Sequence, residues 1–406
     1  MEMESPIERR LQTYFDRIGQ VLGHPSRRAS FAIYGVGLLG DGERKSVEPI
    51  AARACADPDL VEPLHQRLLH FLVDSPWDDH RVRRTAAEYA LAAMAKREPI
   101  DSWVLDDTGF MKQGEHSVGV QRQYTGTVGK VANCQVGVSL TLTTLTEHLP
   151  VDFDLYLPKS WTEDKALRKE AKIPDAVQFR TKPEIALDMI RRAVADRLPQ
   201  GVVLGDTAYG ASGRFREEVR YLGLDYALAV GSKTTVWIAD RKGNPVDDAV
   251  QVGDLAKRIM EAGGFRKTTW RQGTKKGLSA RFAFRRVIPA HDDGWEPTER
   301  EVIWLVMEWE NGEAAPAKYH FLSLPVNTSH KRMVRCLKQR WRTERVYEDL
   351  KGELGLDHYE GRSYPGWQHH VSAVLACYAF LIADRVTSIP PSAREAFEDE
   401  PLALAA

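Results

Sequence analysis

The chain has 406 residues, of which 43% are hydrophobic and 28% charged, the balance of an ordinary globular protein with a sizeable core. A formal net charge of −1 excludes a strongly basic protein, so any contact with nucleic acid must rest on a local basic region. No run of about 18 apolar residues occurs, and the acidic N-terminus MEMESPIERRLQ lacks an apolar segment, so neither a membrane span nor a secretion signal is predicted. Four cysteines without metal-ligand spacing favour reduced thiols in a cytoplasmic protein.

Helices are predicted for the first part of the chain. IERRLQTYFDRIGQVL and LVEPLHQRLLHFLVDS carry apolar residues at helical spacing, and RRTAAEYALAAMAKR is rich in alanine. The pattern predicts a separate helical domain over residues 1–100, which would bind DNA ends or a second protomer.

Strands and helices alternate over residues 101–230. SWVLDDTGF, SVGVQRQYTGT, ANCQVGVSLTLTT and LPVDFDLYLP are short, rich in β-branched or aromatic residues, and separated by turns. An amphipathic helix, KPEIALDMIRRAVADRLP, then precedes the strand GVVLGD, a helix that Ser212 could cap, and the strand LDYALAVG. This alternation predicts an α/β core, a sheet flanked by helices.

The α/β pattern is interrupted over residues 231–320, which contain short strands and lysine- and glycine-rich turns and read as a β-rich insertion. VIWLVMEWENG and KYHFLSLPV are typical of a hairpin returning to a sheet. Helical sequence resumes from about Ser329 to Gly355, and GWQHHVSAVLACYAFLIADRV is apolar enough for a core helix. Residues 321–390 thus form the last part of the core, followed by an acidic tail at 391–406.

The candidate catalytic residues are carboxylates near cations. Asp106 and Asp107 end one apolar run, and Asp206 ends another. The stretch RCLKQRWRTERVYEDLK, residues 335–351, would place a guanidinium, two carboxylates and an ammonium along one helix face: Arg340, Glu344, Glu348 and Lys351.

Three carboxylates drawn together repel, at roughly 4 kcal/mol per pair at about 4 Å and an effective dielectric near 20, unless a cation joins them. Oxygen-only ligands select Mg²⁺ or Mn²⁺, and two such ions support phosphoryl transfer. The residues therefore suggest a metal-dependent nuclease. Arg340 and Lys351, and in the same basic run Lys338 and Arg342, would hold the DNA phosphates.

Each element also has a structural explanation. Aspartates after strands commonly cap turns, Arg340 and Glu344 form an ordinary i,i+4 pair, and a charge run is often a solvated helix face. His369 and His370, adjacent on a helix, point in different directions and favour structural or phosphate-contacting roles.

In combination the motifs resemble insertion-sequence transposases of the DDE type, and more narrowly the branch whose last motif is Tyr, two residues, Arg, three residues, Glu, six residues, Lys. Arg340, Glu344 and Lys351 have that spacing. LDDTGFMKQGEHSVGVQRQYTGTVGKVANCQVGVSLTL is similar to the first-aspartate region, and LGDTAYG to the second. LKGELGLDHYEGRSYPGWQHH is similar to the segment after the glutamate, so the resemblance covers roughly residues 100–385.

The resemblance implies a ribonuclease-H-like fold interrupted by a β-rich insertion, with Asp107, Asp206 and Glu344 as metal ligands. It also implies double-stranded DNA partners, the element's terminal inverted repeats and the target, with a homodimer in the DNA complex. Leu337 stands where the motif has tyrosine and cannot donate a hydrogen bond.

Two ligand assignments keep an alternative, because Asp106 adjoins Asp107, and Glu348 lies one helical turn beyond Glu344. Three alternatives to an active transposase also stand. They are a non-catalytic DNA-binding relic, a resolvase or other nuclease on the same fold, and, less well, a two-carboxylate glycosidase, which leaves the cationic helix face unexplained.

Overall fold

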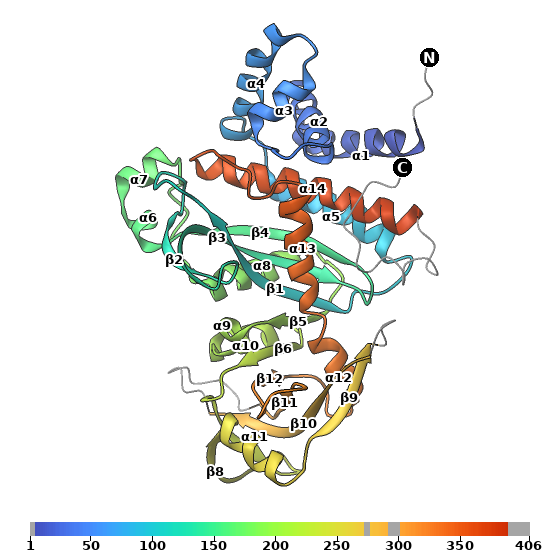
Figure 1. Ribbon diagram of the computed structural model, residues 1–406, viewed down its shortest axis with the longest axis vertical. Helices are drawn as coiled ribbons and strands as arrows, with labels where there is room; N and C mark the ends of the chain where they lie inside the picture. The colour runs from blue at the N-terminus through green and yellow to red at the C-terminus, as the bar shows by residue number, and fades with distance from the viewer. Residues whose placement is uncertain (1–4, 272–276, 291–300, 389–406) are drawn as a thin grey trace. The chain divides into compact units, whose positions relative to one another are not determined.

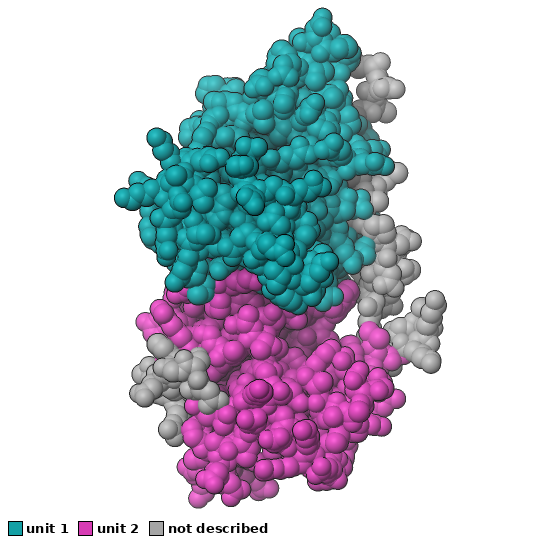
Figure 2. Space-filling view, turned by 60° about the vertical axis from the view of Figure 1, so that its left-hand side comes forward, with its two compact units in different colours: residues 1–99, 107–181, 342–406 teal, residues 100–106, 182–341 magenta. Residues whose placement is uncertain are grey.

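The computed structural model describes residues 5–271, 277–290 and 301–388 and divides into two compact units (Figure 2). Unit 1 comprises Met1–Pro99, Asp107–Thr181 and Arg342–Ala406, and unit 2 comprises Ile100–Asp106 and Lys182–Trp341. The chain therefore crosses between the units four times: between Pro99 and Ile100, inside strand β1 (Ser102–Met111) between Asp106 and Asp107, between Thr181 and Lys182, and at the start of helix α13 (Trp341–Gly352).

Unit 1 begins with helices, as the sequence predicts. Ser5 starts the first one with a capping box, in which its hydroxyl accepts from the Glu8 amide and the Glu8 carboxylate accepts from the Ser5 amide. A short 3₁₀ turn, Pro58–Leu60, precedes α4. The helices are α1 (Pro6–Leu22), α2 (Pro25–Leu39), α3 (Val47–Ala54), α4 (Val61–Val73) and α5 (Asp79–Met94).

Four of these helices, α1, α2, α4 and α5, pack against α14 (Tyr364–Ser388), near the other end of the chain. The Tyr14 hydroxyl donates to the Ala376 carbonyl at 2.7 Å, and the Tyr34 hydroxyl lies 2.8 Å from Nδ1 of His370. Within the described residues α14 is the one helix long and apolar enough to span a membrane, and it is largely buried in unit 1, as a core helix is.

The sheet of unit 1 is built on the long strand β3 (Lys130–Thr143). β2 (Gln121–Thr125) and β4 (His148–Tyr156) pair antiparallel with successive parts of it, and β1 is its other neighbour. In Figure 1, α5 and α14 run along β4, in agreement with their contacts. Two short helices, α6 (Lys159–Glu163) and α7 (Lys165–Glu170), follow β4.

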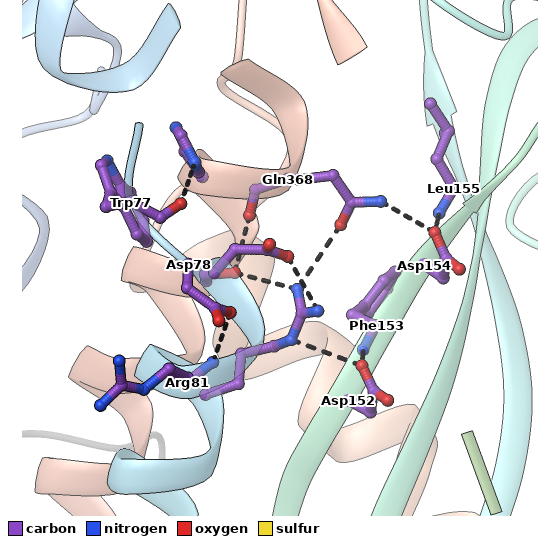
Figure 3. A network of polar contacts seen from close by, with 12 residues as sticks. Trp77, Asp78, Arg81, Asp152, Phe153, Asp154, Leu155 and Gln368 are labelled. Atoms are coloured by element: carbon purple, nitrogen blue, oxygen red, sulfur yellow. Dashed lines mark hydrogen bonds and ion pairs between the residues drawn. The ribbon is translucent and has the colours of Figure 1, made fainter. Parts of the chain in front are cut away.

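A buried polar layer separates β4 from α5 and α14. Arg83 of α5 is 7% exposed, and its guanidinium contacts Asp79 at 2.9 Å, Asp152 of β4 at 3.4 Å and the Ser372 hydroxyl at 2.9 Å. Gln368 of α14 donates to Asp154 of β4 at 2.8 Å (Figure 3). Buried charges are tolerated only when they are paired, so this layer binds the N-terminal helices to the sheet with strict geometry.

Unit 2 holds a mixed sheet, with two parallel pairs and otherwise antiparallel ones. β5 (Val202–Gly205) pairs in parallel with Ser102–Val104 of β1 and with β6 (Tyr226–Val230). β6 is followed across the sheet by β12 (Lys318–Leu322), β11 (Ile303–Trp309), β10 (Leu278–Pro289), β7 (Thr235–Ala239) and β8 (Pro245–Gln251), and β9 (Arg266–Arg271) also pairs with β10.

Helices accompany this sheet: α8 (Lys182–Ala195), α9 (Thr207–Gly210), α10 (Gly213–Tyr221), α11 (Val252–Glu261) and α12 (His330–Leu337). Buried side chains of the strands and of α12 form an apolar cluster that includes Val104, Phe282, Val306, Met333 and Leu337. Trp270, Phe284 and Trp304 pack on this cluster while remaining partly exposed.

The predicted α/β class is confirmed, as are the hairpin of β11 with β12 and the cap of α10, where the Ser212 hydroxyl accepts from the Phe215 amide at 3.2 Å. Helix α11 lies in the stretch where mostly strands were predicted. The tail 391–406 lies outside the described residues.

Candidate active site

Adjacent aspartates in β1 have different surroundings. Both are half-buried, and neighbouring strand residues point to opposite faces. Asp106, the last residue of the first segment of unit 2, has a cation partner there, because Nη2 of Arg340 lies 3.3 Å from its Oδ1. Asp107 is the first residue of the β1 segment that belongs to unit 1. Asp106 therefore forms an ion pair with an arginine of its own unit.

Asp206 follows β5 directly and is the N-cap of α9. Its Oδ1 accepts from the Ala208 amide at 2.9 Å, the capping role that the sequence offered as the structural explanation. Its Oδ2 makes no hydrogen bond within the described chain. One carboxylate oxygen therefore orients the side chain, and the other is free to bind a ligand.

The predicted single helix face over residues 335–351 is wrong, because the helix is broken. α12 ends at Leu337, Lys338 is its C-cap, and α13 begins at Trp341. Arg340 lies in the turn between the two helices, so it is not one turn before Glu344 on a shared face. The break turns the Arg340 side chain toward Asp106 instead.

Glu344 lies in the first turn of α13 with its side chain exposed. Among the described residues its carboxylate has neither a hydrogen bond nor an ion pair. Glu348, one turn later, is also exposed but lies 3.7 Å from Nη1 of Arg345. In this structure Glu344 is thus the carboxylate on α13 that is open to a ligand.

Lys351 is tied to β1 immediately after Asp107. Its Nζ donates to the Thr108 hydroxyl and to the Gly109 carbonyl, each at 2.8 Å, and lies 5.2 Å from the centre of the Phe110 ring. Burial lowers the pKa of Lys351, while Asp357 acts in the opposite direction. The ammonium therefore joins α13 to the strand of Asp107, both in unit 1, and is not a partner of Glu348.

Two further contacts fix α13 on the sheet of unit 1. The Tyr347 hydroxyl lies 2.7 Å from the Ser139 hydroxyl of β3. Arg342 is 5% exposed, and its guanidinium donates to the Thr146 carbonyl at 3.0 Å and to the Leu145 carbonyl in the loop between β3 and β4. The hydrogen bond by which Ser139 and Tyr347 hold α13 was not predicted from the sequence. Its only indication there is the tyrosine one turn after Glu344.

The predicted DNA contacts by Arg342 and Lys338 stay predictions, and both side chains have internal partners. Lys338 in unit 2 is paired with the nearly buried Glu308, and its Nζ lies 4.5 Å from the centre of the Trp270 ring. Leu337, at the position of the motif's tyrosine, belongs to the apolar cluster of unit 2. The Leu337 side chain thus has a core role that a tyrosine hydroxyl would not share.

The adjacent histidines have structural roles, one of the two alternatives that the sequence left. His369 stacks on Trp77 at 3.8 Å between ring centres, and its ring nitrogens contact the carbonyls of Leu72 and Trp77. His370 is fully buried, and burial lowers its pKa to about 4.

The donors fit Mg²⁺ or Mn²⁺ in kind, since the open atoms are the carboxylate oxygens of Glu344 and Oδ2 of Asp206. Over the residues that the structure describes, no group of three or more His, Cys, Asp or Glu side chains is close enough to hold a metal ion.

Comparison with known proteins agrees with the resemblance read from the sequence. The model of a family of DDE superfamily endonucleases matches residues 17–277, a range that includes Asp107 and Asp206 and ends before Glu344. A probable transposase for insertion sequence element IS701 of Microchaete diplosiphon is 31% identical to the chain over 214 residues, which are 52% of this chain and 51% of that protein. The chain thus matches about half the length of this relative.

Proposed function

Because this chain belongs to the DDE superfamily of endonucleases, we propose that it is a DNA transposase that cleaves the ends of a mobile element and joins them to target DNA. The similarity to the probable IS701 transposase supports this reading. The observation that carries it is the state of Glu344, an exposed carboxylate that has no partner in the described part of the chain and lies on a helix that is otherwise held firmly. A glutamate in the first turn suits the dipole of any helix, so the support lies in the combination of an open carboxylate with a firmly held backbone.

In this proposal Asp107, Asp206 and Glu344 are the metal ligands, on a ribonuclease-H-like core. Two Mg²⁺ or Mn²⁺ ions, when bound, would activate the attacking oxygen and stabilise the leaving oxygen of phosphoryl transfer. The protein's own part is to hold the carboxylates: Asp206 by its bond to the Ala208 amide, and Glu344 by the contacts of Tyr347 and Arg342.

The substrates in this proposal are the element's terminal inverted repeats and the target, both double-stranded DNA. Pairing two ends calls for two active sites, so a homodimer is expected in the DNA complex. Arg340 and Lys351 would contact phosphates at the site, which requires each to exchange a present partner for the phosphate.

The test is cleavage of labelled DNA carrying the ends that flank the gene, in Mg²⁺ or Mn²⁺, by the wild type and by Glu344→Gln and Glu348→Gln. We expect Glu344→Gln to lower cutting at least a hundredfold with DNA binding retained, and Glu348→Gln to change it less than threefold. The two variants are matched, because both remove one exposed carboxylate charge from the same helix.

The other outcomes select the alternatives. Wild-type protein that binds these ends but cuts nothing with either metal would be the non-catalytic relic. Cutting of branched DNA regardless of end sequence would identify a resolvase. Loss of cutting only in Glu348→Gln would move the third ligand by one helical turn.

A further inference from the structure

Lys45, between α2 and α3, is a buried lysine that forms no ion pair with a carboxylate of the described residues. It is 7% exposed, and its Nζ donates to the carbonyls of Leu38 at 2.7 Å, Gly40 at 2.9 Å and Glu353. An ammonium has three donors, and here all three are used. Burying a charged lysine costs free energy. A buried ammonium whose three hydrogen bonds are all made therefore indicates that the charge has a specific role at this position.

The three acceptors belong to the ends of two helices. Leu38 and Gly40 lie in the last turn and at the C-cap of α2, and Glu353 follows the last residue of α13. The final carbonyls of a helix lack partners inside it and carry the negative end of its dipole, so both ends favour a cation. Lys45 therefore joins the end of α2 to the end of the helix that carries Glu344.

The turn after α13 has further contacts with the same N-terminal segment. The Lys45 amide donates to Nδ1 of His358 at 3.1 Å. Nε2 of His370 lies 3.2 Å from the Gly355 carbonyl and 3.1 Å from the Leu356 carbonyl. Since carbonyls only accept, Nε2 carries the proton, and Nδ1 then accepts from the Tyr34 hydroxyl of α2.

Gly355 shows how closely the two segments approach. Its φ is +65°, a conformation that favours glycine, and a Cβ at this position would lie 2.7 Å from Cβ of Lys45. The turn is thus shaped to admit the Lys45 side chain to the end of α13.

We propose that Lys45 is a positioning residue, whose ammonium fixes the C-terminal end of α13 and thereby the orientation of Glu344 and Lys351. The proposal rests on the proposed function. Glu344 precedes Glu353 by nine residues, or about 13 Å along the helix axis. Arg342 and Tyr347 hold the first turns of α13 and Lys45 holds its far end, so both anchors set the direction of the helix axis. A tilt of about 5° over this length corresponds to about 1 Å, and a misplacement of that size can cost roughly a hundredfold in rate.

The experiment compares full-length Lys45→Met with wild type and with Arg44→Met. Methionine keeps a stem of similar length and removes the ammonium. Arg44 is the matched control, since it is the adjacent cation and its pair with Glu360, at 2.7 Å, has both side chains largely exposed. Cleavage of the labelled ends, DNA binding and the Mn²⁺ concentration for half-maximal cutting are measured where all three proteins are folded.

We expect Lys45→Met to cut at least tenfold more slowly and to need at least threefold more Mn²⁺, with DNA binding changed less than twofold. Arg44→Met should match wild type in all three. A lysine that merely stabilised the fold would leave the Mn²⁺ requirement unchanged. Cutting by Lys45→Met within twofold of wild type, or an unchanged Mn²⁺ requirement, would therefore overturn the proposal.

Hydrogen exchange separates this proposal from the proposed function, because it needs no activity. In Lys45→Met we expect the amides of Glu353, Leu356 and His358, which bond to Asp349, Leu350 and Gly355, to exchange at least tenfold faster than in wild type. Amides of β6 in unit 2 serve as the internal reference. Unchanged exchange after α13 would refute the tether even if the wild type cuts DNA, and faster exchange would support it even if the wild type cuts nothing.

Discussion

Unit 1 places a network of ionised groups between β4 and its helices, whereas the core cluster under α12 in unit 2 is apolar, although unit 2 also buries Glu308, which is paired with Lys338. Arg83, Asp152 and Asp154 lie between β4 and the helices of unit 1, and Asp349 of α13 is 3% exposed beside Arg345 at 3.1 Å. The cluster under α12 in unit 2 is apolar, with Trp270, Phe284 and Trp304 at its margin. A polar layer requires fixed geometry, while apolar packing tolerates adjustment, so unit 1 is the better support for a precisely held helix such as α13.

Among the substitutions that test this comparison, Arg83→Met should cause the largest loss of stability, because it leaves Asp79 and Asp152 without their shared cation. Removing one partner of a buried ion pair costs about 3–5 kcal/mol. Urea denaturation, followed by a probe in each unit, should show this loss in unit 1. A loss below about 1 kcal/mol would mean that water replaces the guanidinium and that the layer is not strictly organised.

Lowering the pH should destabilise unit 1, because His370 is buried there in its neutral form. Burial lowers its pKa from 6.5 to about 4, so between these values the unfolded chain binds a proton that the folded chain does not. The free energy of unfolding therefore falls as the pH falls through this window, by about 3 kcal/mol in all.

His370→Gln, which keeps a donor and an acceptor, should remove that part of the pH dependence when unfolding is measured at pH 7, 5.5 and 4.5. In unit 2, burial lowers the pKa of His320 to about 3. The pH dependence of stability that His320 contributes is therefore still present in the variant, and it extends to more acidic pH. An identical pH profile for wild type and variant would show that His370 is not the group responsible.

Gly210→Ala tests a tight point in unit 2, next to Asp206. An added Cβ would lie 1.8 Å from the Ala229 carbonyl oxygen, which is backbone and cannot rotate away. We expect a loss of about 1–3 kcal/mol from overpacking, together with slower DNA cutting, since α9 is the helix that Asp206 caps. Wild-type stability measured by thermal unfolding would contradict the close approach of α9 to β6.

The smallest effect is expected from Arg191→Met in unit 2, whose pairs with Asp188 and Glu218 lie at the surface. Exposed ion pairs contribute about 0–1 kcal/mol, less at high salt. Thermal unfolding in low and high salt would measure this. A loss as large as that of Arg83→Met would remove the distinction between buried and exposed charge on which the comparison rests.

Sequence patterns predicted the elements that have strong periodicity, such as α8 and α14, and the two strands that carry Asp107 and precede Asp206. The break at Lys338–Arg340 was not predicted, because KQR has neither glycine nor proline and the local pattern remains helical. The partners of Arg342 and Lys45 were also beyond sequence reasoning. Both side chains bind backbone carbonyls, and carbonyl acceptors leave no residue-type signal along the chain.

The order in which the segments of the two units follow one another along the chain has a consequence for synthesis on the ribosome. Unit 2 has all its residues once Trp341 has emerged, but unit 1 needs Arg342 onward, including α13 and α14, for the partners of Tyr14, Tyr34 and Lys45. At about 5–20 residues per second, the N-terminal helices wait tens of seconds with their apolar faces uncovered. The first helices translated therefore complete their unit last, and a product truncated before Arg342 lacks both their covering helix and Glu344.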